Sequence, residues 1–383
     1  MSPYLLVLLV SFGVTFAVTP AVRWAAVRSG NVVPPDERRV HAKPTATLGG
    51  MAMFVGFLAA MAVAWSLSDF KPVFSGSSEP LGVVLAALVI FVIGAVDDLK
   101  DLSAPAKIAG CVLAGSVLVY YGVSIFYLRI PFGDILVLGD DLIPLVTVVW
   151  VIVVANAVNL VDGLDGLAAG IVAIAGGAFY LYIRKLADPE VGLVAPSSVS
   201  PLLAVILVGI CLGFLPWNFH PAKIFMGDAG AYLLGLLMAA STMVVGGRTL
   251  PTTKYSGQKY FFFAPLVIPV FILGVPMFDS VFSFLRRVGR GDGFAKADKA
   301  HIHHRLMNMG HGQRRSVAIL WFWTALLSTG VLIPVYTKRG NGVVAIGIGG
   351  AVLLLYTSFH PVVRRHRRRN HPAEATALDT SPE

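Results

Sequence analysis

Hydrophobic residues occur along this chain in long runs separated by short polar segments. A helix needs about 20 apolar residues to cross a bilayer. Windows of this kind lie at 3–22, 48–67, 80–96, 106–124, 142–158, 166–183, 199–216, 229–246, 261–284, 316–336 and 343–360. The pattern predicts an all-α, polytopic membrane protein with about 11 transmembrane helices, or ten if one of the shorter windows does not cross.

The composition supports this interpretation. Of the 383 residues, 56% are hydrophobic and 13% are charged, whereas soluble domains carry about 25% charged residues. Cys111 and Cys211 each lie inside an apolar run and are expected to be buried thiols without a disulfide. We expect one transmembrane catalytic domain over residues 1–362, a disordered basic tail over residues 363–383, and no nucleic-acid partner.

The distribution of positive charge predicts the orientation. If the N-terminus lies outside, the inside segments are 23–47, 97–107, 159–165, 217–228, 285–315 and the tail from 361, and they hold 21 of the 30 Lys and Arg residues. Cytoplasmic loops are enriched in these residues. No basic segment precedes the first window, so we expect a first helix and no cleaved leader. The C-terminus is then cytoplasmic, and the membrane is a cell membrane.

The inside segments also carry the polar motifs. Asp97 and Asp98 end the apolar run of "FVIGAVDDLKDLS", although an Asp costs roughly 2.5–3.5 kcal/mol in a membrane helix. Both carboxylates could bind a divalent cation, or one could bind it while the other acts as a base. The alternative is a helix end with solvated acids. Lys107 follows at the start of the next window, where it could hold a phosphate.

A second motif is "NAVNLVDGLDGLAAG" at 156–170, in which Asn156, Asn159, Asp162 and Asp165 recur every third residue. Neighbouring members share a helix face, so they are expected to form the wall of a polar pocket. Helix packing through the glycines is the alternative, but it leaves the four polar groups unexplained.

Two further motifs carry charge. In "WNFHPAKIFMGDAGAYLLG", Asp228 opens a helix, where it is either a cap or a metal ligand, with Asn218, Lys223 and Phe225 in the preceding loop. In "ADKAHIHHRL", three histidines accompany Lys299 and Arg305. This group fits anionic phosphate better than zinc, because no Cys accompanies it. Asp279 lies within the ninth window and either has a function or pairs with an arginine.

Acids for a metal, a polar pocket and a basic loop on one side of a membrane are typical of phosphoryl transfer. A transporter or lipid flippase is the alternative from another class, but it would place polar groups near the middle of the membrane. A structural scaffold would leave the acids unexplained.

Together, "KPTATLGG", "DDLKDLS", "NLVDGLDGLAAG", "FMGDAGAYLLG" and "HIHHRL" resemble, in this order, motifs of the polyprenyl-phosphate N-acetylhexosamine-1-phosphate transferases. The resemblance implies transfer of a sugar-1-phosphate from a UDP-amino sugar to a polyprenyl phosphate, with release of UMP. It also implies a requirement for Mg²⁺, with Mn²⁺ as an alternative, and is compatible with a homodimer.

The resemblance also implies residue roles. Asp228 resembles the Mg²⁺ ligand, Asp98 a carboxylate near the metal, and Asp97 the base for the lipid phosphate. The remaining expected catalytic residues are Asp165 and His301. The expected substrate-binding residues are Lys43, Thr45, Lys107, Asn159, Asp162, Asn218, Phe225, His303, His304 and Arg305.

Two branches of this family differ in the histidine motif. The branch that uses UDP-MurNAc-pentapeptide usually has three consecutive histidines, whereas the branch that uses UDP-GlcNAc has "HIHH" or "HLHH", as this chain does. We therefore expect a bacterial UDP-GlcNAc:polyprenyl-phosphate transferase with a cytoplasmic active site, which starts a cell-envelope glycan. The pentapeptide transferase is the alternative. Ala231 departs from the serine common in the family, which makes the donor sugar inferred from the resemblance less secure.

Overall fold

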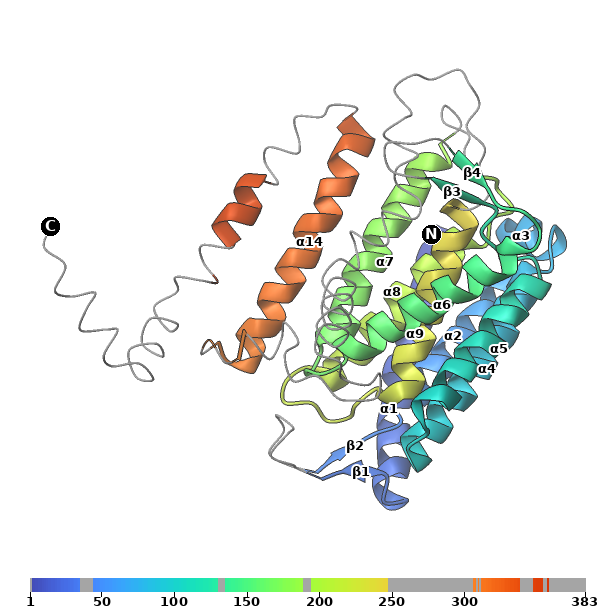
Figure 1. Cartoon of the computed structure of the whole chain (residues 1–383). Helices are drawn as coiled ribbons and strands as arrows, with labels where there is room; N and C mark the ends of the chain where they lie inside the picture. The colour runs from blue at the N-terminus through green and yellow to red at the C-terminus, as the bar shows by residue number, and fades with distance from the viewer. Residues whose placement is uncertain are drawn as a thin grey trace, which may run out of the picture.

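The computed structural model describes residues 2–34, 44–129, 135–188, 194–246, 306–307, 309, 311–337, 347–353 and 357. Figure 1 shows a bundle of long helices that run in roughly the same direction, with short strands at both ends. The predicted window 261–284, Asp279 and the tail 363–383 lie outside the described residues.

The long helices match the apolar windows. They are α1 (Pro3–Arg28), α2 (Gly50–Ser66), α4 (Glu79–Lys100), α5 (Ala104–Tyr120), α6 (Leu142–Val161), α7 (Leu167–Leu186), α8 (Ser200–Asn218), α9 (Gly227–Gly246) and α14 (Gln313–Thr337). In the described part of the chain, seven are long and apolar enough to cross a membrane. The number is eight if α2 and the bent segment after it form one span. The prediction of a polytopic helical membrane protein is confirmed, while the total number of spans stays a prediction.

Short elements close the ends of the bundle. The segment after α2 consists of a 3-10 turn (Ser68–Phe70) and α3 (Lys71–Ser75), at 90° to α2. Strands β1 (Val32–Val33) and β2 (Thr45–Ala46) pair antiparallel, as do β3 (Tyr127–Arg129) and β4 (Ile135–Val137). The two pairs lie at opposite ends of the bundle (Figure 1).

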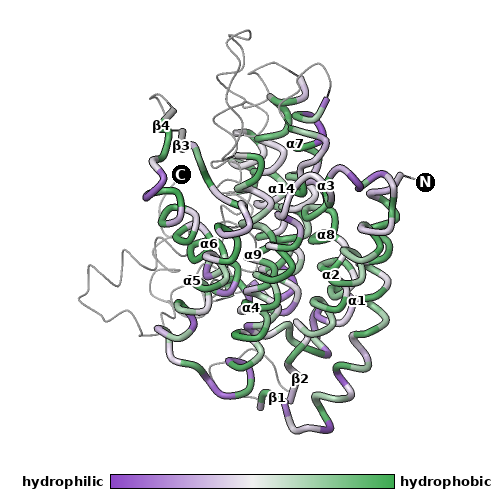
Figure 2. Tube along the Cα trace, turned by 90° about the vertical axis from the view of Figure 1, so that its right-hand side faces the viewer, coloured by the Kyte–Doolittle hydropathy of each residue, from purple (hydrophilic) through white to green (hydrophobic). Residues whose placement is uncertain are grey.

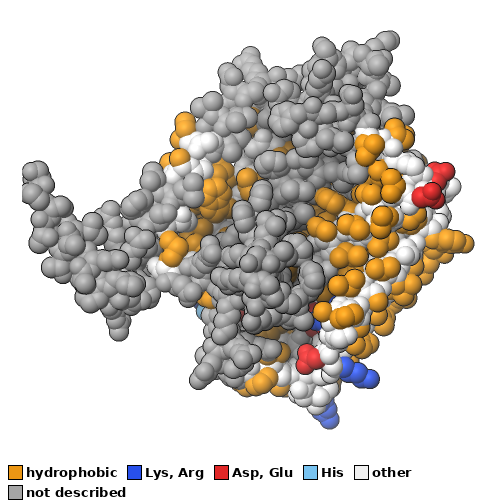
Figure 3. Space-filling model, viewed as in Figure 1, with side chains coloured by type: hydrophobic (Ala, Val, Ile, Leu, Met, Phe, Trp, Pro, Cys, Tyr) orange, Lys and Arg blue, Asp and Glu red, His pale blue; other side chains and the backbone are white. Residues whose placement is uncertain are grey.

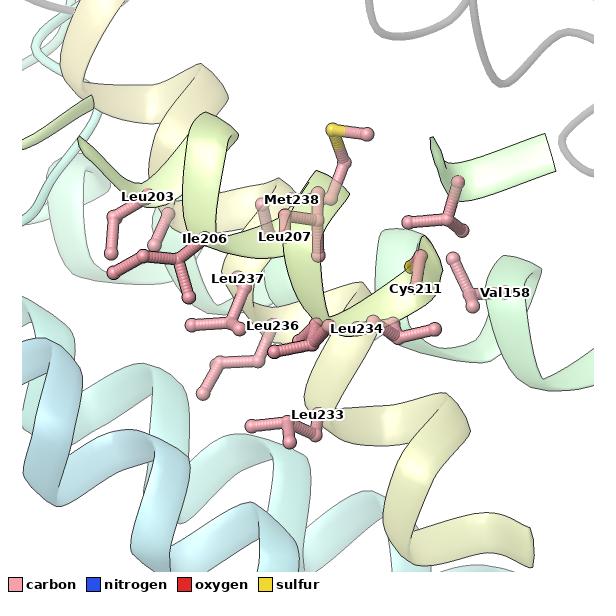
Figure 4. Close-up of a cluster of buried hydrophobic side chains, with 14 of the residues drawn as sticks. Val158, Leu203, Ile206, Leu207, Cys211, Leu233, Leu234, Leu236, Leu237 and Met238 are labelled. Carbon is pink, nitrogen blue, oxygen red and sulfur yellow. The ribbon is translucent and has the colours of Figure 1, made fainter. Parts of the chain in front are cut away.

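Helix α9 lies at the centre of the bundle. Its apolar window is 94% buried, against 28–44% for the windows of α1, α4, α6 and α14. Figure 4 shows leucines of α8 and α9 packed together with Met238, Cys211 and, from α6, Val158. Small residues allow the close approach: a Cβ at Gly94 would lie 2.5 Å from Ala229 Cα, and one at Gly235 would lie 2.5 Å from Ala155 Cα. Without a hydrophobic force between helices in lipid, such close packing is a main source of association.

The outer surface of the bundle suits lipid. Exposed leucines and valines lie on α4, α5 and α6, among them Leu88, Val92 and Leu145. Figure 3 shows many hydrophobic side chains on this face, with charged side chains near its ends. Figure 2 shows the same division along the chain, with hydrophobic helix centres and hydrophilic segments at the helix ends. The helix ends are therefore the places where polar chemistry can occur.

Helix α14 is fixed to α7 at two points. The indole of Trp321 donates a hydrogen bond to the carbonyl of Leu167 (3.3 Å), and the hydroxyl of Tyr336 donates one to the carbonyl of Leu181 (2.8 Å). These contacts place the chain that follows the histidine motif beside the start of α7.

Candidate active site

The predicted polar residues meet at one end of the bundle. The end of α4, the start of α5, the end of α6 and the start of α9 are joined there by side-chain contacts. The contacts connect residues up to 131 positions apart in the sequence. The packing of the helices therefore brings together the three motifs that contain Asp97, Asn159 and Asp228, with Lys107 at the start of α5.

Lys107 lies between two carboxylates. Its ammonium contacts Asp97 Oδ2 at 2.5 Å and Asp228 Oδ2 at 2.9 Å. The other oxygen of Asp228 accepts a hydrogen bond from the amide of Asn159 (3.0 Å), and Asp97 Oδ1 accepts one from the backbone N–H of Leu102 (2.7 Å). Asp97 is only 4% exposed, whereas Asp228 and Lys107 are 27% and 29% exposed. One cation thus links the two carboxylates at a partly open site.

Asp98 binds the beginning of α9. Its Oδ1 accepts the backbone N–H of Asp228 (2.7 Å) and its Oδ2 accepts that of Ala229 (3.2 Å). The first N–H groups of a helix have no partner within the helix and favour a negative charge. Gly227 precedes these amides with φ +68°, and a Cβ there would collide with the Asp98 carboxylate. Asp98 therefore holds Asp228 in place, and its predicted role as a metal ligand stays a prediction.

The two adjacent acids thus have different partners. Neighbouring residues of a helix point about 100° apart, so Asp97 faces Lys107 on α5 while Asp98 faces α9. The sequence placed both acids at one helix end. The division between them follows from which helices pack on either side of α4.

The turn between α6 and α7 carries two more acids. Burial raises the pKa of Asp162 well above its usual range, and the negative charges of Asp228, Asp98 and Asp165 raise it further. Asn156, the first residue of this motif, bonds instead to the carbonyl of Ile152 in its own helix (2.8 Å). Asn156 therefore bonds within α6, whereas Asn159 contacts Asp228, and the predicted wall of a polar pocket stays a prediction.

Asp165 pairs with a histidine that the sequence analysis did not identify. Its Oδ2 lies 2.7 Å from Nδ1 of His220 and accepts the backbone N–H of Ala222 (3.1 Å). His220 stands within the motif "WNFHPAKIFMGD", but nothing in the spacing of residues 165 and 220 indicates that they meet. The contact arises because the loop between α8 and α9 lies on the turn between α6 and α7.

Asn218 attaches the loop between α8 and α9 to the turn between α6 and α7. Its side-chain oxygen accepts the N–H of Gly166 (3.0 Å), its amide donates to the carbonyl of Ile224 (3.0 Å), and it is 2% exposed. Both ends of the amide thus bind backbone groups, and the predicted contact with substrate stays a prediction. Lys223 of this loop is exposed and lies over the ring of Trp217 at 5.1 Å, outside the cluster around Asp228.

The motif "KPTATLGG", which contains β2, is hydrogen-bonded to the loop between α8 and α9. The N–H of Phe225 donates to Ala46 (2.9 Å), and the N–H of Gly49 donates to Phe225 (2.9 Å). Thr45 of β2 is 6% exposed. Both predicted substrate-binding residues, Thr45 and Phe225, therefore belong to one connected structure. The other predicted residues, Lys43, His301, His303, His304 and Arg305, lie outside the described residues.

Comparisons with known proteins identify relatives of this chain. The model of glycosyl transferase family 4 matches residues 80–246, a range that contains the Asp97, Asn159 and Asp228 motifs. The chain is 36% identical to the decaprenyl-phosphate N-acetylglucosaminephosphotransferase of Mycolicibacterium smegmatis, over 92% of this chain and 87% of that one.

Two other relatives are similar over less of the chain. The probable undecaprenyl-phosphate N-acetylglucosaminyl 1-phosphate transferase of Bacillus subtilis is 32% identical over 85% of this chain and 83% of its own. The phospho-N-acetylmuramoyl-pentapeptide-transferase of Desulforudis audaxviator is 35% identical over 64% of this chain and 77% of its own.

The cap formed by Asp98 can be tested without substrate or metal. We expect Asp98→Ala to lower the melting temperature of the purified protein in detergent and EDTA, because loss of a helix cap costs about 1 kcal/mol. Asp98→Asn keeps one of the two acceptor oxygens, so its melting temperature should fall by less. Equal melting temperatures for the wild type and Asp98→Ala would contradict the capping role.

Proposed function

Since the chain belongs to glycosyl transferase family 4, we propose that it transfers GlcNAc-1-phosphate from UDP-GlcNAc to a polyprenyl phosphate. The products are polyprenyl-diphosphate-GlcNAc and UMP. The observation that carries this proposal is the similarity to the decaprenyl-phosphate N-acetylglucosaminephosphotransferase over 92% of the chain. The arrangement of Asp97, Lys107 and Asp228 supports it, because phosphoryl transfer depends on positioned charges.

The reaction makes one bond and breaks one. An oxygen of the lipid phosphate attacks the β-phosphorus of the UDP-sugar, and the bond from this phosphorus to the bridging oxygen breaks, so that UMP leaves with the electron pair. In this proposal Asp97 accepts the proton of the lipid phosphate, as the sequence analysis expected. Lys107 orients Asp97 and stabilises negative charge that develops on the phosphoryl oxygens.

The donor set fits Mg²⁺, and Mn²⁺ is an alternative. Among the described residues, no three His, Cys, Asp or Glu side chains are arranged to hold a metal ion. Mg²⁺ does not require such a cage, because it commonly binds one or two carboxylates together with substrate phosphates. Asp228 would hold it, with Asp98 as the other predicted ligand. The carboxylates of Asp97 and Asp228 already share one positive charge, the ammonium of Lys107, so the donors at this site suit a cation. When bound, Mg²⁺ would neutralise charge on the diphosphate.

Two other functions fit the observations less well. The pentapeptide transferase relative matches only 64% of the chain, against 92% and 85% for the two GlcNAc-1-phosphate transferase relatives. For a transporter or flippase, polar groups near the middle of the membrane would be expected, whereas Asp97, Asp98, Asp162, Asp165 and Asp228 lie at helix ends or in turns. The observations therefore favour UDP-GlcNAc as the donor.

A competition assay tests the reaction and the donor together. Purified enzyme, polyprenyl phosphate and Mg²⁺ are mixed with UDP-GlcNAc and UDP-MurNAc-pentapeptide at equal concentration. We expect UMP release and a lipid product that carries mainly GlcNAc. A product that carries mainly the pentapeptide sugar would overturn the donor assignment, and absence of UMP release with any UDP-sugar would overturn the reaction.

The metal assignment is tested with Asp228→Asn. This substitution removes a charge but keeps the shape of the side chain, so the protein should accumulate and melt near the wild-type temperature. We expect UMP release to fall by about two to three orders of magnitude, as for the loss of a strong transition-state interaction. The Mg²⁺ concentration for half-maximal activity should rise. Wild-type turnover with unchanged Mg²⁺ dependence would refute the assignment.

The orientation is part of the proposal. The active-site end is cytoplasmic, because 21 of the 30 Lys and Arg residues lie in the segments predicted to be inside. Ser77 and Ser103 flank opposite ends of α4. With single cysteines at these positions in a chain lacking Cys111 and Cys211, an impermeant reagent should label position 77 in intact cells and not position 103. Labelling at position 103 alone would show that the chain has the opposite orientation.

A further inference from the structure

The pair formed by Asp165 and His220 has no role in the reaction as described so far. Asp165 is 7% exposed and accepts from Nδ1 of His220 (2.7 Å) and from the backbone of Ala222 (3.1 Å). A buried carboxylate is costly unless it is paired. Among the described residues, His220 supplies the paired side chain, so its Nδ1 is the donor and the ring orientation is fixed by Asp165.

The other ring nitrogen of His220 is available. No described residue forms a hydrogen bond with Nε2, and the side chain is 32% exposed. The guanidinium of Arg314, at the start of α14, donates to the carbonyl of His220 (3.1 Å) and is itself exposed. An imidazole beside a buried carboxylate and a neighbouring guanidinium provides donors and positive charge toward the solvent. This combination suits an anionic ligand such as a phosphate group.

The pair also lies near the reacting groups along the chain. Asn159, which binds Asp228, is six residues before Asp165, so the two are separated by at most about 20 Å of extended chain. The loop that carries His220 leads to Asp228 eight residues later and contains Phe225. Asp162, between the two groups, is influenced electrostatically by Asp165, Asp98 and Asp228. The turn after α6 and the loop before α9 thus connect the two groups, and a nucleoside diphosphate that reaches from one to the other would contact both.

Lys107 cannot neutralise the substrate alone, because it is already bound by two carboxylates. We propose that His220 binds as an imidazolium, with Nδ1–H on Asp165 and Nε2–H donating to the phosphate that leaves as UMP. Asp165 is then a positioning residue that acts through His220. This inference rests on the proposed function for the identity of the ligand. The sequence analysis expected Asp165 to be catalytic, and here it orients the group that touches the substrate.

Binding of UMP and of uridine to the purified full-length protein, measured by calorimetry at a fixed Mg²⁺ concentration, tests the proposal. We expect His220→Gln to weaken UMP binding about tenfold, the effect of one charge-assisted hydrogen bond, and to leave uridine binding within about twofold. Asp165→Asn should change UMP binding in the same direction. In the His220→Gln background it should add nothing further, because residues that act as a unit are not additive.

Arg23→Gln is the matched control. The Arg23 side chain ties the same loop to α1 through the carbonyl of Lys223 (3.0 Å) but adds no group beside His220. This variant should bind UMP and uridine as the wild type does. If it instead reproduces the His220→Gln effect on UMP alone, the selective loss does not report on the imidazole, and the proposal fails.

Three other outcomes would overturn the inference. They are an equal loss of UMP and uridine binding in His220→Gln, unchanged UMP binding, and a rise confined to the KM for polyprenyl phosphate, which would place the contact on the acceptor. Failure of the proposed function gives a different result. A protein that binds UMP through His220 but releases none from UDP-GlcNAc would contradict the proposed reaction and leave the His220 contact standing.

Discussion

The bond between the Asp98 carboxylate and the first amides of α9 is the contact on which the geometry of the site depends. It satisfies the N–H groups of Asp228 and Ala229 at the start of the most buried helix. It also satisfies a carboxylate that would otherwise be costly at a membrane boundary. Because the amide of Asp228 is itself one of the donors, the same contact fixes the carboxylate that faces Lys107.

Close helix packing makes this contact possible. Gly94, one turn before Asp98, lets α4 approach the backbone of α9 so closely that a Cβ would lie 2.5 Å from Ala229. Gly227, with φ +68°, leaves room for the Asp98 carboxylate itself. In lipid, helices associate through such contacts between small residues. The packing that stabilises the bundle is therefore also the packing that positions the charged groups.

The charges at this end of the bundle form two groups with different environments. Around Lys107, one ammonium group contacts the carboxylates of Asp97 and Asp228. Around His220, the buried carboxylate of Asp165 binds the imidazole, and the guanidinium of Arg314 donates to the carbonyl of His220. A metal-bound diphosphate requires both kinds of environment, since its metal needs oxygen ligands and its oxygens need donors. Arg314, which supplies this guanidinium, lies at the start of α14, and α14 is itself attached to α7.

The sequence by itself determined the class of fold, the helices and the region of the site. Lipid requires each crossing segment to satisfy its own backbone and to be apolar over its length, so windows such as 80–96 and 142–158 predicted α4 and α6 without knowledge of their neighbours. The same constraint confined Asp97, Asp162 and Asp228 to helix ends or turns, and their motifs carried the resemblance to the family.

Only the tertiary structure decided the roles of individual side chains. It showed that Asp97 contacts Lys107 whereas Asp98 binds the start of α9. It also showed that Asn218 bonds to backbone groups and that Asp165 pairs with His220. These contacts join residues 10 to 131 positions apart. Local periodicity reports which face of a helix a residue occupies, but the neighbour on that face depends on how the helices pack.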